Sequence, residues 1–402
     1  MWALEKSTGF NWLKICFHPA FRILYKIKYF IIIPAIHSPF TSNIKDMQPI
    51  LSIDIGAGTT DILVFYPDTY EHYKAVAVSP VRKIAKTIQG AGSDLLLSGT
   101  IMGGGAVSNA IIQHAKTHKV FMTRRAAKTI NDDLKKVRAK GVTIVSEEEK
   151  EKLSVTAITH IILRDMFPLG IRALLDELGV AWKFSYLAAA VQDHGVPPHG
   201  VSSIDFRHQI MKTIIDEKPV PEAFLFRVEE IPPYLTRMKA TGELLSEIPH
   251  QKAFMMDTGM AAVIGASLDP NIQGCSHCLV VDIGNSHTLG ACLSNGLIGG
   301  FFEYHTNHLT PQRIEELLVN LGNGTLEHSR VVSEGGHGAY IRSCPGFNKI
   351  EKIVVTGPRR YEIMRGVNLE YKEGGPLGDT MMTGTAGLIE AIKRNENLNI
   401  NF

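Results

Sequence analysis

Short apolar runs of strand length alternate along the chain with stretches whose apolar positions have helical spacing. At Leu51–Phe65 two apolar runs flank a glycine-containing turn, which predicts a β-hairpin, and a third strand is expected near Tyr73–Ser79. Next, an apolar run at Asp94–Gly99 leads through a glycine loop into helical spacing at Val107–His118. Strand, loop and helix in this order are typical of α/β proteins with parallel strands, so we expect an α/β fold.

The same criteria predict further elements in the remaining two thirds of the chain. The Asn-rich segment at the C-terminal end is expected to be frayed. The expected elements are helices at 157–178, 260–268 and 385–392, buried strands at 184–191 and 352–356, and the frayed tail from residue 394.

The hairpin pattern occurs twice. Leu51–Phe65 reads LSIDIGAGTTDILVF and Leu279–Leu293 reads LVVDIGNSHTLGACL. Each has an apolar run, an Asp, a turn with glycine and hydroxyl residues, and a second apolar run. The two segments indicate a weak internal duplication, and two such hairpins facing each other would hold a nucleotide between two similar lobes.

Glycines and acids in these turns suit phosphate chemistry. Gly56, Gly58 and Gly284 can adopt backbone angles closed to other residues and let N–H groups approach an anion closely. Asp54 and Asp282 follow the first strand of each hairpin. Mg²⁺ prefers a few carboxylates together with phosphate oxygens and water, so we expect these two acids to hold Mg²⁺. The alternative is that each caps its own turn.

Other turn residues carry donors. Thr59 and Thr60 are placed to offer hydroxyl and amide groups to the β- and γ-phosphates, or else they are strand residues with hydroxyls facing water. In the second turn the corresponding residues are Asn285, Ser286 and His287. If His287 is protonated it would contact phosphate, and if it is neutral it would contact a metal. The third interpretation is a histidine that is packed and hydrogen-bonded in the core.

Hydrolysis of ATP also needs a base or a water-orienting acid. Asp193 and Asp257 each follow a predicted strand, where ligands of open α/β sheets gather. The competing interpretation for both is an ordinary loop or helix-capping Asp. Asp61, on the returning strand of the first hairpin, is either structural or a further functional acid.

Composition sets limits on these hypotheses. At 402 residues the chain is long enough for two or more domains. A formal charge of +2 argues against wholesale nucleic-acid binding. Five cysteines, an odd number, are too few for a disulfide scaffold and favour a reducing, cytoplasmic location.

Residues 1–46 are aromatic and basic. Their longest stretch without charge, Tyr29–Ile36, is far shorter than the roughly 20 apolar residues of a spanning helix. Three interpretations remain: an upstream translation before a true start at Met47, an interfacial membrane anchor, or a helix packed on the domain. A membrane contact is expected only if this segment belongs to the native protein.

Five motifs together resemble a known superfamily. DIGAGTTD (Asp54–Asp61) and DIGNSHTLGA (Asp282–Ala291) resemble the first and second phosphate motifs of the actin, sugar-kinase and heat-shock chaperone ATPases. DTGMAAVIGA (Asp257–Ala266) resembles their first connecting segment, and KIVVTGPRRYE (Lys352–Glu362) the adenosine motif. GDTMMTGTAGLIEA (Gly378–Ala391) resembles the closing helix. The order and spacing of the five motifs agree with this superfamily.

This resemblance implies two actin-like (ribonuclease H-like) lobes, each with a mixed five-stranded sheet flanked by helices, and a nucleotide cleft between them. The implied cofactors are ATP and Mg²⁺, and Gly357 would lie against adenine or ribose. The expected boundaries are 47–268 for the first lobe, 269–395 for the second and 396–402 for the tail.

Within the superfamily the chain is most similar to a prokaryotic family of unknown function whose members are often labelled "putative pyruvate formate-lyase activating protein". That label implies radical chemistry, which needs three closely spaced cysteines that this sequence lacks. The chain also departs from the superfamily pattern at Asn285-Ser-His287 and at Gly357-Pro358. A different or weaker mode of nucleotide binding would follow.

A cysteine pair, Cys275-Ser-His-Cys278, offers half of a zinc or iron–sulfur site. A homodimer could pool two such pairs, which is the basis of a weak redox-activator hypothesis. The alternative is a labile thiol pair or plain linker residues. The later histidines, His305, His308 and His337 among them, have no metal-ligand spacing in the sequence.

The leading hypothesis is a Mg²⁺-dependent ATPase of the actin-like superfamily that couples lobe closure to action on an unknown protein partner or small molecule. A small-molecule kinase is the first alternative, and it should have a polar pocket in the insertion at roughly 120–250. A non-catalytic nucleotide sensor or scaffold is the second, since the altered motifs would fit lost turnover.

Overall fold

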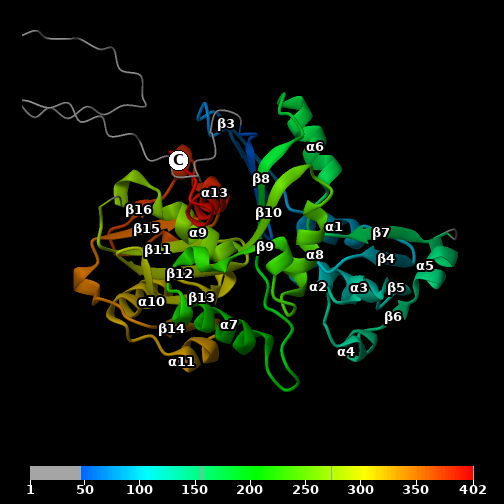
Figure 1. The fold of residues 1–402 in the computed structure, drawn as a ribbon. Coiled ribbons are helices and arrows are strands. Elements are labelled where there is room, and N and C mark those ends of the chain that lie inside the picture. Colours follow the sequence, from blue (N-terminus) through cyan, green and yellow to red (C-terminus); the bar gives the residue numbers. More distant parts are fainter. Residues whose placement is uncertain (1–46, 155–156, 273, 402) are drawn as a thin grey trace, which may run out of the picture. The chain divides into compact units, whose positions relative to one another are not determined.

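The computed structural model describes residues 47–154, 157–272 and 274–401 (Figure 1). The expectations for residues 1–46 lie outside this part of the chain. All described residues belong to one compact unit. Within the described residues the strands form three sheets.

The first sheet contains the first predicted hairpin. Its order is β3-β2-β1-β8-β10-β9, with β1 to β3 antiparallel and β8 and β10 parallel to β1. Its central strands are buried on both faces, as their continuous apolar runs predict. The strands are Ile50–Ile55 (β1), Thr59–Phe65 (β2), His72–Val78 (β3), Phe184–Val191 (β8), Leu225–Arg227 (β9) and His250–Asp257 (β10).

The second sheet repeats this plan. Its order is β14-β13-β12-β11-β15-β16, with an antiparallel β11–β12–β13 meander and β15 parallel to β11. The expected pair of α/β lobes with mixed sheets is thus confirmed. The strands are His277–Ile283 (β11), His287–Ser294 (β12), Leu297–His305 (β13), Gly336–Ile341 (β14), Lys352–Thr356 (β15) and Lys372–Glu373 (β16).

The expected number of five strands per sheet is wrong. Each of the two sheets has six strands, because one antiparallel edge strand is added. In the first sheet the extra strand is the short β9, which pairs with β10. In the second it is β14, which pairs with β13.

A third, wholly parallel sheet is inserted into the first lobe in the order β6-β5-β4-β7, and it has its own apolar core. The helix expected at 157–178 is wrong in its first half. Ile161 and Leu163 pair with β4 as a strand, and the helix begins only at Pro168, whose ring suits a first helical turn. The strands are Leu95–Gly99 (β4), Val120–Thr123 (β5), Val142–Val145 (β6) and Thr159–Leu163 (β7).

Helices surround the sheets and alternate with their strands. In the inserted region they are Pro80–Gln89 (α1), Gly105–His114 (α2), Arg124–Ala127 (α3), Leu134–Arg138 (α4), Glu147–Ser154 (α5) and Pro168–Glu177 (α6). The later helices are Ser203–Glu217 (α7), Thr236–Leu245 (α8), Thr258–Ser267 (α9), Pro311–Asn323 (α10), His328–Ser333 (α11), Arg360–Met364 (α12) and Thr383–Glu396 (α13).

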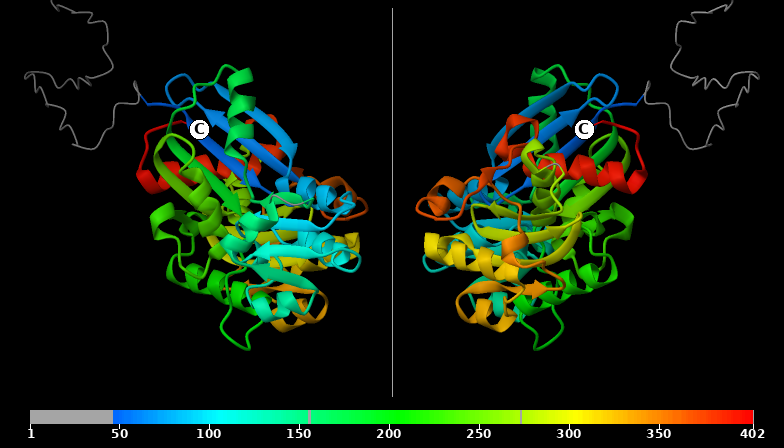
Figure 2. Two further views of the ribbon diagram at one scale, coloured as in Figure 1. Left: turned by 90° about the vertical axis from the view of Figure 1, so that its right-hand side faces the viewer. Right: turned by 90° about the vertical axis from the view of Figure 1, so that its left-hand side faces the viewer.

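Helices α9 and α13 pack side by side where the two large sheets meet (Figures 1 and 2). Helix α9 follows the last long strand of the first sheet but contacts β11 and β15 of the second, whereas α13 contacts β1 and β8 of the first. A Cβ at Gly265 would overlap the backbone of Thr383, and one at Gly387 the backbone of Ala261. The two glycines therefore allow the helix backbones to touch.

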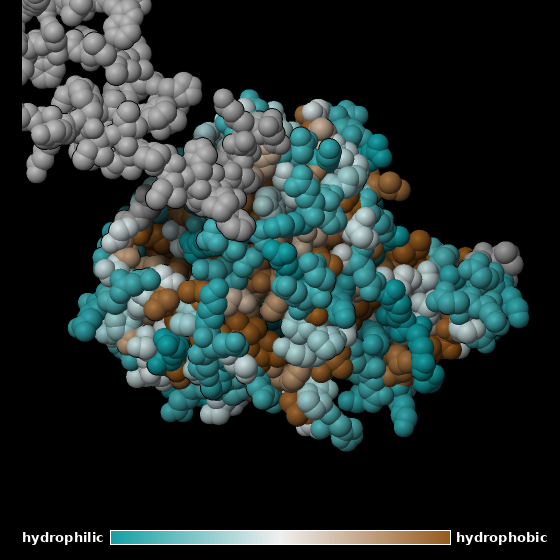
Figure 3. All heavy atoms as spheres, in the orientation of Figure 1, coloured by the Kyte–Doolittle hydropathy of each residue, from teal (hydrophilic) through white to brown (hydrophobic). Residues whose placement is uncertain are grey.

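The C-terminal tail is not frayed, contrary to expectation. Asn397 adopts the left-handed conformation that ends α13, and Ile400 then returns to the core with 2% of its surface exposed. Hydrophilic residues cover most of the face drawn in Figure 3, with apolar residues between them. No helix among the described residues combines the length and the apolar character needed to cross a bilayer.

Candidate functional site

The two predicted turns have the same backbone geometry. In the first, the Gly56 N–H donates to the Thr59 carbonyl over 3.0 Å. In the second, the Gly284 N–H donates to the His287 carbonyl over the same distance. The sequence repeat therefore corresponds to a structural repeat.

These turns also meet. A Cβ at Gly58 would overlap the side-chain amide of Asn285, so the tip of one hairpin lies against the tip of the other. None of Gly56, Gly58 and Gly284 has a positive φ, so the expectation that they supply unusual backbone angles is wrong. They are needed for their small size: a Cβ at Gly284 would lie 2.6 Å from the His287 carbonyl oxygen.

Three carboxylates gather beneath the two turns. Asp61 pairs directly with Asp54 across the first hairpin. Burial raises the pKa of Asp54 to about 6, that of Asp61 to about 8 and that of Asp282 to about 7, and the Asp54 charge adds to the last two pKa shifts. The Asp61 Oδ1 atom is buried without a hydrogen-bond partner among the described residues. The hairpins thus bring together mutually repelling acids.

Asp54 is held by the helices that join the sheets. The Thr258 hydroxyl, at the start of α9, donates to Asp54 Oδ1 over 2.6 Å. A Cβ at Gly384, at the start of α13, would overlap the same carboxylate. The packing of α9 and α13 thereby fixes the position of this acid.

Gly357 lies against the second hairpin. It has φ +92°, and a Cβ there would lie 2.7 Å from Asp282 Oδ1 and 2.5 Å from the Ile283 carbonyl oxygen. The requirement for glycine at this position comes from these contacts. Its role beside adenine or ribose stays a prediction.

The donors of the turns differ in their surroundings. Thr60 is 7% exposed, and its hydroxyl has no hydrogen-bond partner in the described part of the chain. Thr59 is partly exposed at the start of β2. In the second turn the Ser286 carbonyl accepts from the Thr306 N–H over 2.9 Å, and the Thr306 hydroxyl donates to the Gly284 carbonyl. The second turn is therefore braced by Thr306, which directly follows β13, and the Thr60 hydroxyl stays unpaired in the described part of the chain.

Asp193 and Asp257, the predicted bases, both have structural partners. The two carboxylate oxygens of Asp193 accept N–H bonds from Gly195 and Met238, each over 2.8 Å. Asp257 caps α9 and forms an ion pair with Arg207 over 2.9 Å. That either carboxylate acts as a base stays a prediction.

A buried ion pair, Arg207–Glu303, was not predicted. Arg207 on α7 contacts both carboxylate oxygens of Glu303 on β13, and each residue is 4% exposed. Burial alone would raise the pKa of Glu303, but the guanidinium outweighs it and brings the pKa to about 2. The sequence signal was a lone acid within the apolar run of β13.

The cysteine pair is not part of a group of three potential metal ligands among the described residues. Burial, with the neighbouring Cys275, raises the pKa of Cys278 to about 12, which disfavours the thiolate that binds metals. Within the described residues, the one set of three or more potential ligands spaced for a single ion is His194, His287 and His337.

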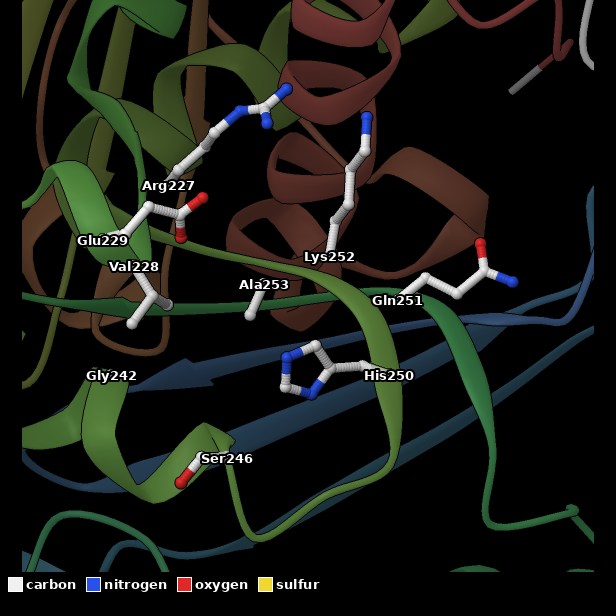
Figure 4. A pocket seen from close by; sticks show the side chains of 9 residues that line it. All are labelled: Arg227, Val228, Glu229, Gly242, Ser246, His250, Gln251, Lys252 and Ala253. Atoms are coloured by element: carbon white, nitrogen blue, oxygen red, sulfur yellow. The ribbon is translucent and has the colours of Figure 1, made fainter.

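Two further hollows lie away from the hairpins. One, of about 200 Å³, lies by β9 and β10, where Arg227 and Lys252 point toward α13 (Figure 4). Glu396 of α13 pairs with both cations, so their charge is compensated. The other, of about 590 Å³, lies between α8 and the segment from α3 to the start of α4, and its lining has more basic than acidic residues.

Comparison with solved structures gives matches of low identity and low TM-score. AlfA, a protein from the B. subtilis plasmid pLS32 whose filament structure is solved, is 11% identical. Its TM-score is 0.36, over 85% of this chain and 98% of AlfA. The ethanolamine utilization protein EutJ from Carboxydothermus hydrogenoformans is 12% identical (TM-score 0.32; 84% and 87% covered). MreB5 of Spiroplasma citri bound to ADP is 10% identical (TM-score 0.32; 87% and 98% covered). No curated protein matches the sequence.

The strand order of the two large sheets, an antiparallel meander followed by parallel strands, confirms the predicted actin-like architecture. A family profile matches residues 102–362, which include the second hairpin and the segment around Gly357. The chain therefore belongs to the family described as "Putative pyruvate format-lyase activating enzyme (DUF1786)".

Proposed function

We propose that this protein binds ATP and Mg²⁺ between its two hairpin turns and acts as an ATPase on a partner or substrate. The observation that carries the proposal is the meeting of two equivalent turns, at Gly58 and Asn285, above three crowded carboxylates. A nucleotide triphosphate is the ligand that two such turns would hold in common.

The residues fit a cation. Asp54, Asp61 and Asp282 repel one another, and Asp61 Oδ1 lacks a partner among the described residues. Mg²⁺ binds through a few carboxylates while keeping water and phosphate oxygens, so these acids would hold it directly or through water. When bound, the ion would neutralise charge on transferring phosphoryl oxygens.

Residues of the chain would position the phosphate groups and the carboxylate of Asp54. The Thr60 hydroxyl is buried without a hydrogen-bond partner among the described residues, so it would donate to a phosphate oxygen once the turns separate. Thr258 fixes Asp54 by its hydrogen bond. Because Asn285 lies against Gly58, a ligand between the turns requires that the Asn285 side chain move or the turns separate.

Calorimetric titration of ATP into the full chain, with and without Mg²⁺, tests the proposal together with an assay of phosphate release. We expect Mg²⁺-dependent binding and slow turnover, both lost in Asp54→Asn and retained in the control Asp68→Asn, which lies on an exposed loop. No binding of ATP by the folded wild-type chain would refute the proposal. Binding without turnover would identify a nucleotide sensor.

The 590 Å³ hollow favours a small-molecule kinase as a second candidate. It lies in the insertion where a kinase pocket is expected, and Arg124, Lys128 and Lys239 line it together with Asp132 and an Arg125–Glu243 ion pair. This basic lining suits an anionic substrate. Phosphate transfer from ATP to an added anionic metabolite, lost in Lys239→Ala, would establish the kinase activity. Turnover unaffected by any such anion would favour the ATPase.

A further inference from the structure

Three histidines from distant parts of the sequence meet beside the second turn. His194 follows β8 of the first lobe, His287 begins β12, and His337 lies in β14. One ring nitrogen from each lies within 4.8 Å of the others. This spacing allows one ion to contact all three rings after small side-chain adjustments.

The backbone at His337 forms a β-bulge. In the ladder between β13 and β14, Glu303 pairs with Gly338 and Tyr304 pairs with Gly336, so His337 is the extra residue of a β-bulge. Bulges re-aim a side chain and recur next to active sites. Here the bulge directs the His337 ring toward His287, with 4.6 Å between ring centroids.

The ring nitrogens are short of partners. His287 Nε2 and His337 Nδ1 are buried and have no hydrogen-bond partner among the described residues, and His337 is only 6% exposed. The other nitrogen of His337, Nε2, lies 2.9 Å from His305 Nε2. A metal-binding histidine typically uses one nitrogen for the metal while the other is held by a neighbour, which is the arrangement at His337.

Burial keeps the three rings neutral. Together with a smaller contribution from the Arg207 guanidinium, it lowers the pKa of His194 and His287 to about 3 and that of His337 to about 4. The Glu303 charge raises the pKa of the three histidines, but Glu303 is already paired with Arg207. Neutral imidazole is the form that binds a metal.

We propose that His194, His287 and His337 bind one divalent transition-metal ion of the Zn²⁺ type, with His305 orienting His337. Three imidazoles suit Zn²⁺ or a similar ion better than Mg²⁺, which prefers oxygen ligands, and they leave one position of a tetrahedral ion open. The ion joins the loop after β8 in the first lobe to two strands of the second. The three ligands are other side chains than the hairpin carboxylates, although His287 also ends the second turn, and the test below needs no nucleotide.

The test uses the full chain prepared without a histidine tag and freed of metal by chelation. Calorimetry with ZnCl₂ and the visible spectrum of the Co²⁺ form are measured for the wild type, His287→Gln and His337→Gln. We expect about one equivalent of Zn²⁺ and a Co²⁺ spectrum of nitrogen ligation. Both should be lost in the two variants, and affinity should fall about 10–100-fold in His305→Phe.

Two controls make the result decisive. His114→Gln removes a buried histidine that bonds to the Ser93 carbonyl outside the cluster, and it should bind Zn²⁺ like the wild type. Circular dichroism checks that each variant is folded. Absence of Zn²⁺ and Co²⁺ binding by the wild type would overturn the proposal. So would binding that survives in folded His287→Gln and His337→Gln, or that is lost in a Cys275→Ser, Cys278→Ser variant.

Discussion

Asp61 faces Asp54 across the first hairpin, with one oxygen buried and unpaired in the described structure. We expect Asp61→Asn to raise the melting temperature of the ligand-free protein at pH 7 by a few degrees. The Asp61 carboxyl, whose pKa is raised to about 8 in the folded chain, must take up a proton on folding, and the amide need not. The additional stabilisation by Mg²⁺ and ATP should be smaller than in the wild type. Thermal unfolding with and without Mg²⁺ and ATP measures both effects.

The matched control is Asp68→Asn, an exposed loop acid, which should change neither quantity. A ligand-free Asp61→Asn protein that is less stable than the wild type would show that Asp61 is a structural anchor. In that case the acids beneath the turns are not a cation site in the form proposed.

Glu303 makes stability depend on pH. Its pKa is about 2 in the folded chain against an ordinary value of 4.5. A depressed carboxyl pKa contributes stability that is complete above pH 4.5 and is lost as the pH falls toward 2. Urea unfolding should show Glu303→Gln to be about 3 kcal/mol less stable than the wild type at pH 7, because Arg207 loses a buried partner. The difference should be ~1 kcal/mol smaller at pH 4.

Glu316→Gln is the control for this pair, since Glu316 is an exposed partner of Arg313 on α10. It should cost under about 1 kcal/mol at either pH. Equal effects of the Glu303 and Glu316 substitutions would contradict the role given to the buried pair.

Residues of the candidate site differ in how far the sequence could predict them. Asp54 and Asp282 were predicted because each follows a strand within a repeated local pattern, and local patterns survive in sequence. His194, His287 and His337 could not be grouped, because only the pairing of distant strands and a bulge bring them together. The glycines were correctly placed but for the wrong reason, since they provide room rather than positive φ.

At the scale of elements, the contact between α9 and α13 depends on glycine. A Cβ at Gly387 would overlap the Ala261 backbone, so Gly387→Ala must push the helices apart. Chemical denaturation should show a loss of about 1–3 kcal/mol, the usual cost of overpacking. Because α13 also positions Asp54 through Gly384, ATP affinity should fall as well.

Gly92→Ala is the control, because a Cβ at Gly92 meets nothing within 4 Å and its φ is not positive. It should leave stability and nucleotide affinity unchanged. If Gly387→Ala behaved like Gly92→Ala, the close helix contact would not exist in solution.

Elements with local signals were predicted well, and elements defined by partners were not. Both hairpins and α9 were predicted because turn residues and small-residue helical spacing are local features. Strand β7 was assigned to a helix because its apolar run fits either structure, and only pairing with β4 decides. Of the inserted parallel sheet only β4 was predicted, because the other three strands are short and are defined by their pairing.

At the scale of the whole molecule, two similar sheets are joined by helices that each pack on the other lobe's sheet. The turns of the two hairpins are in contact through Gly58 and Asn285. A ligand that binds between them therefore has to alter the contacts of both turns at once. A ligand that binds to a single lobe would alter only one turn.

Hydrogen exchange of the full chain, with and without ATP and Mg²⁺, tests this claim most directly. We predict slower amide exchange in both turns, Gly56–Thr59 and Gly284–His287, at the same ATP concentration, and no such change in Asp54→Asn. Slower exchange in only one turn, or in neither while ATP is bound, would contradict the account.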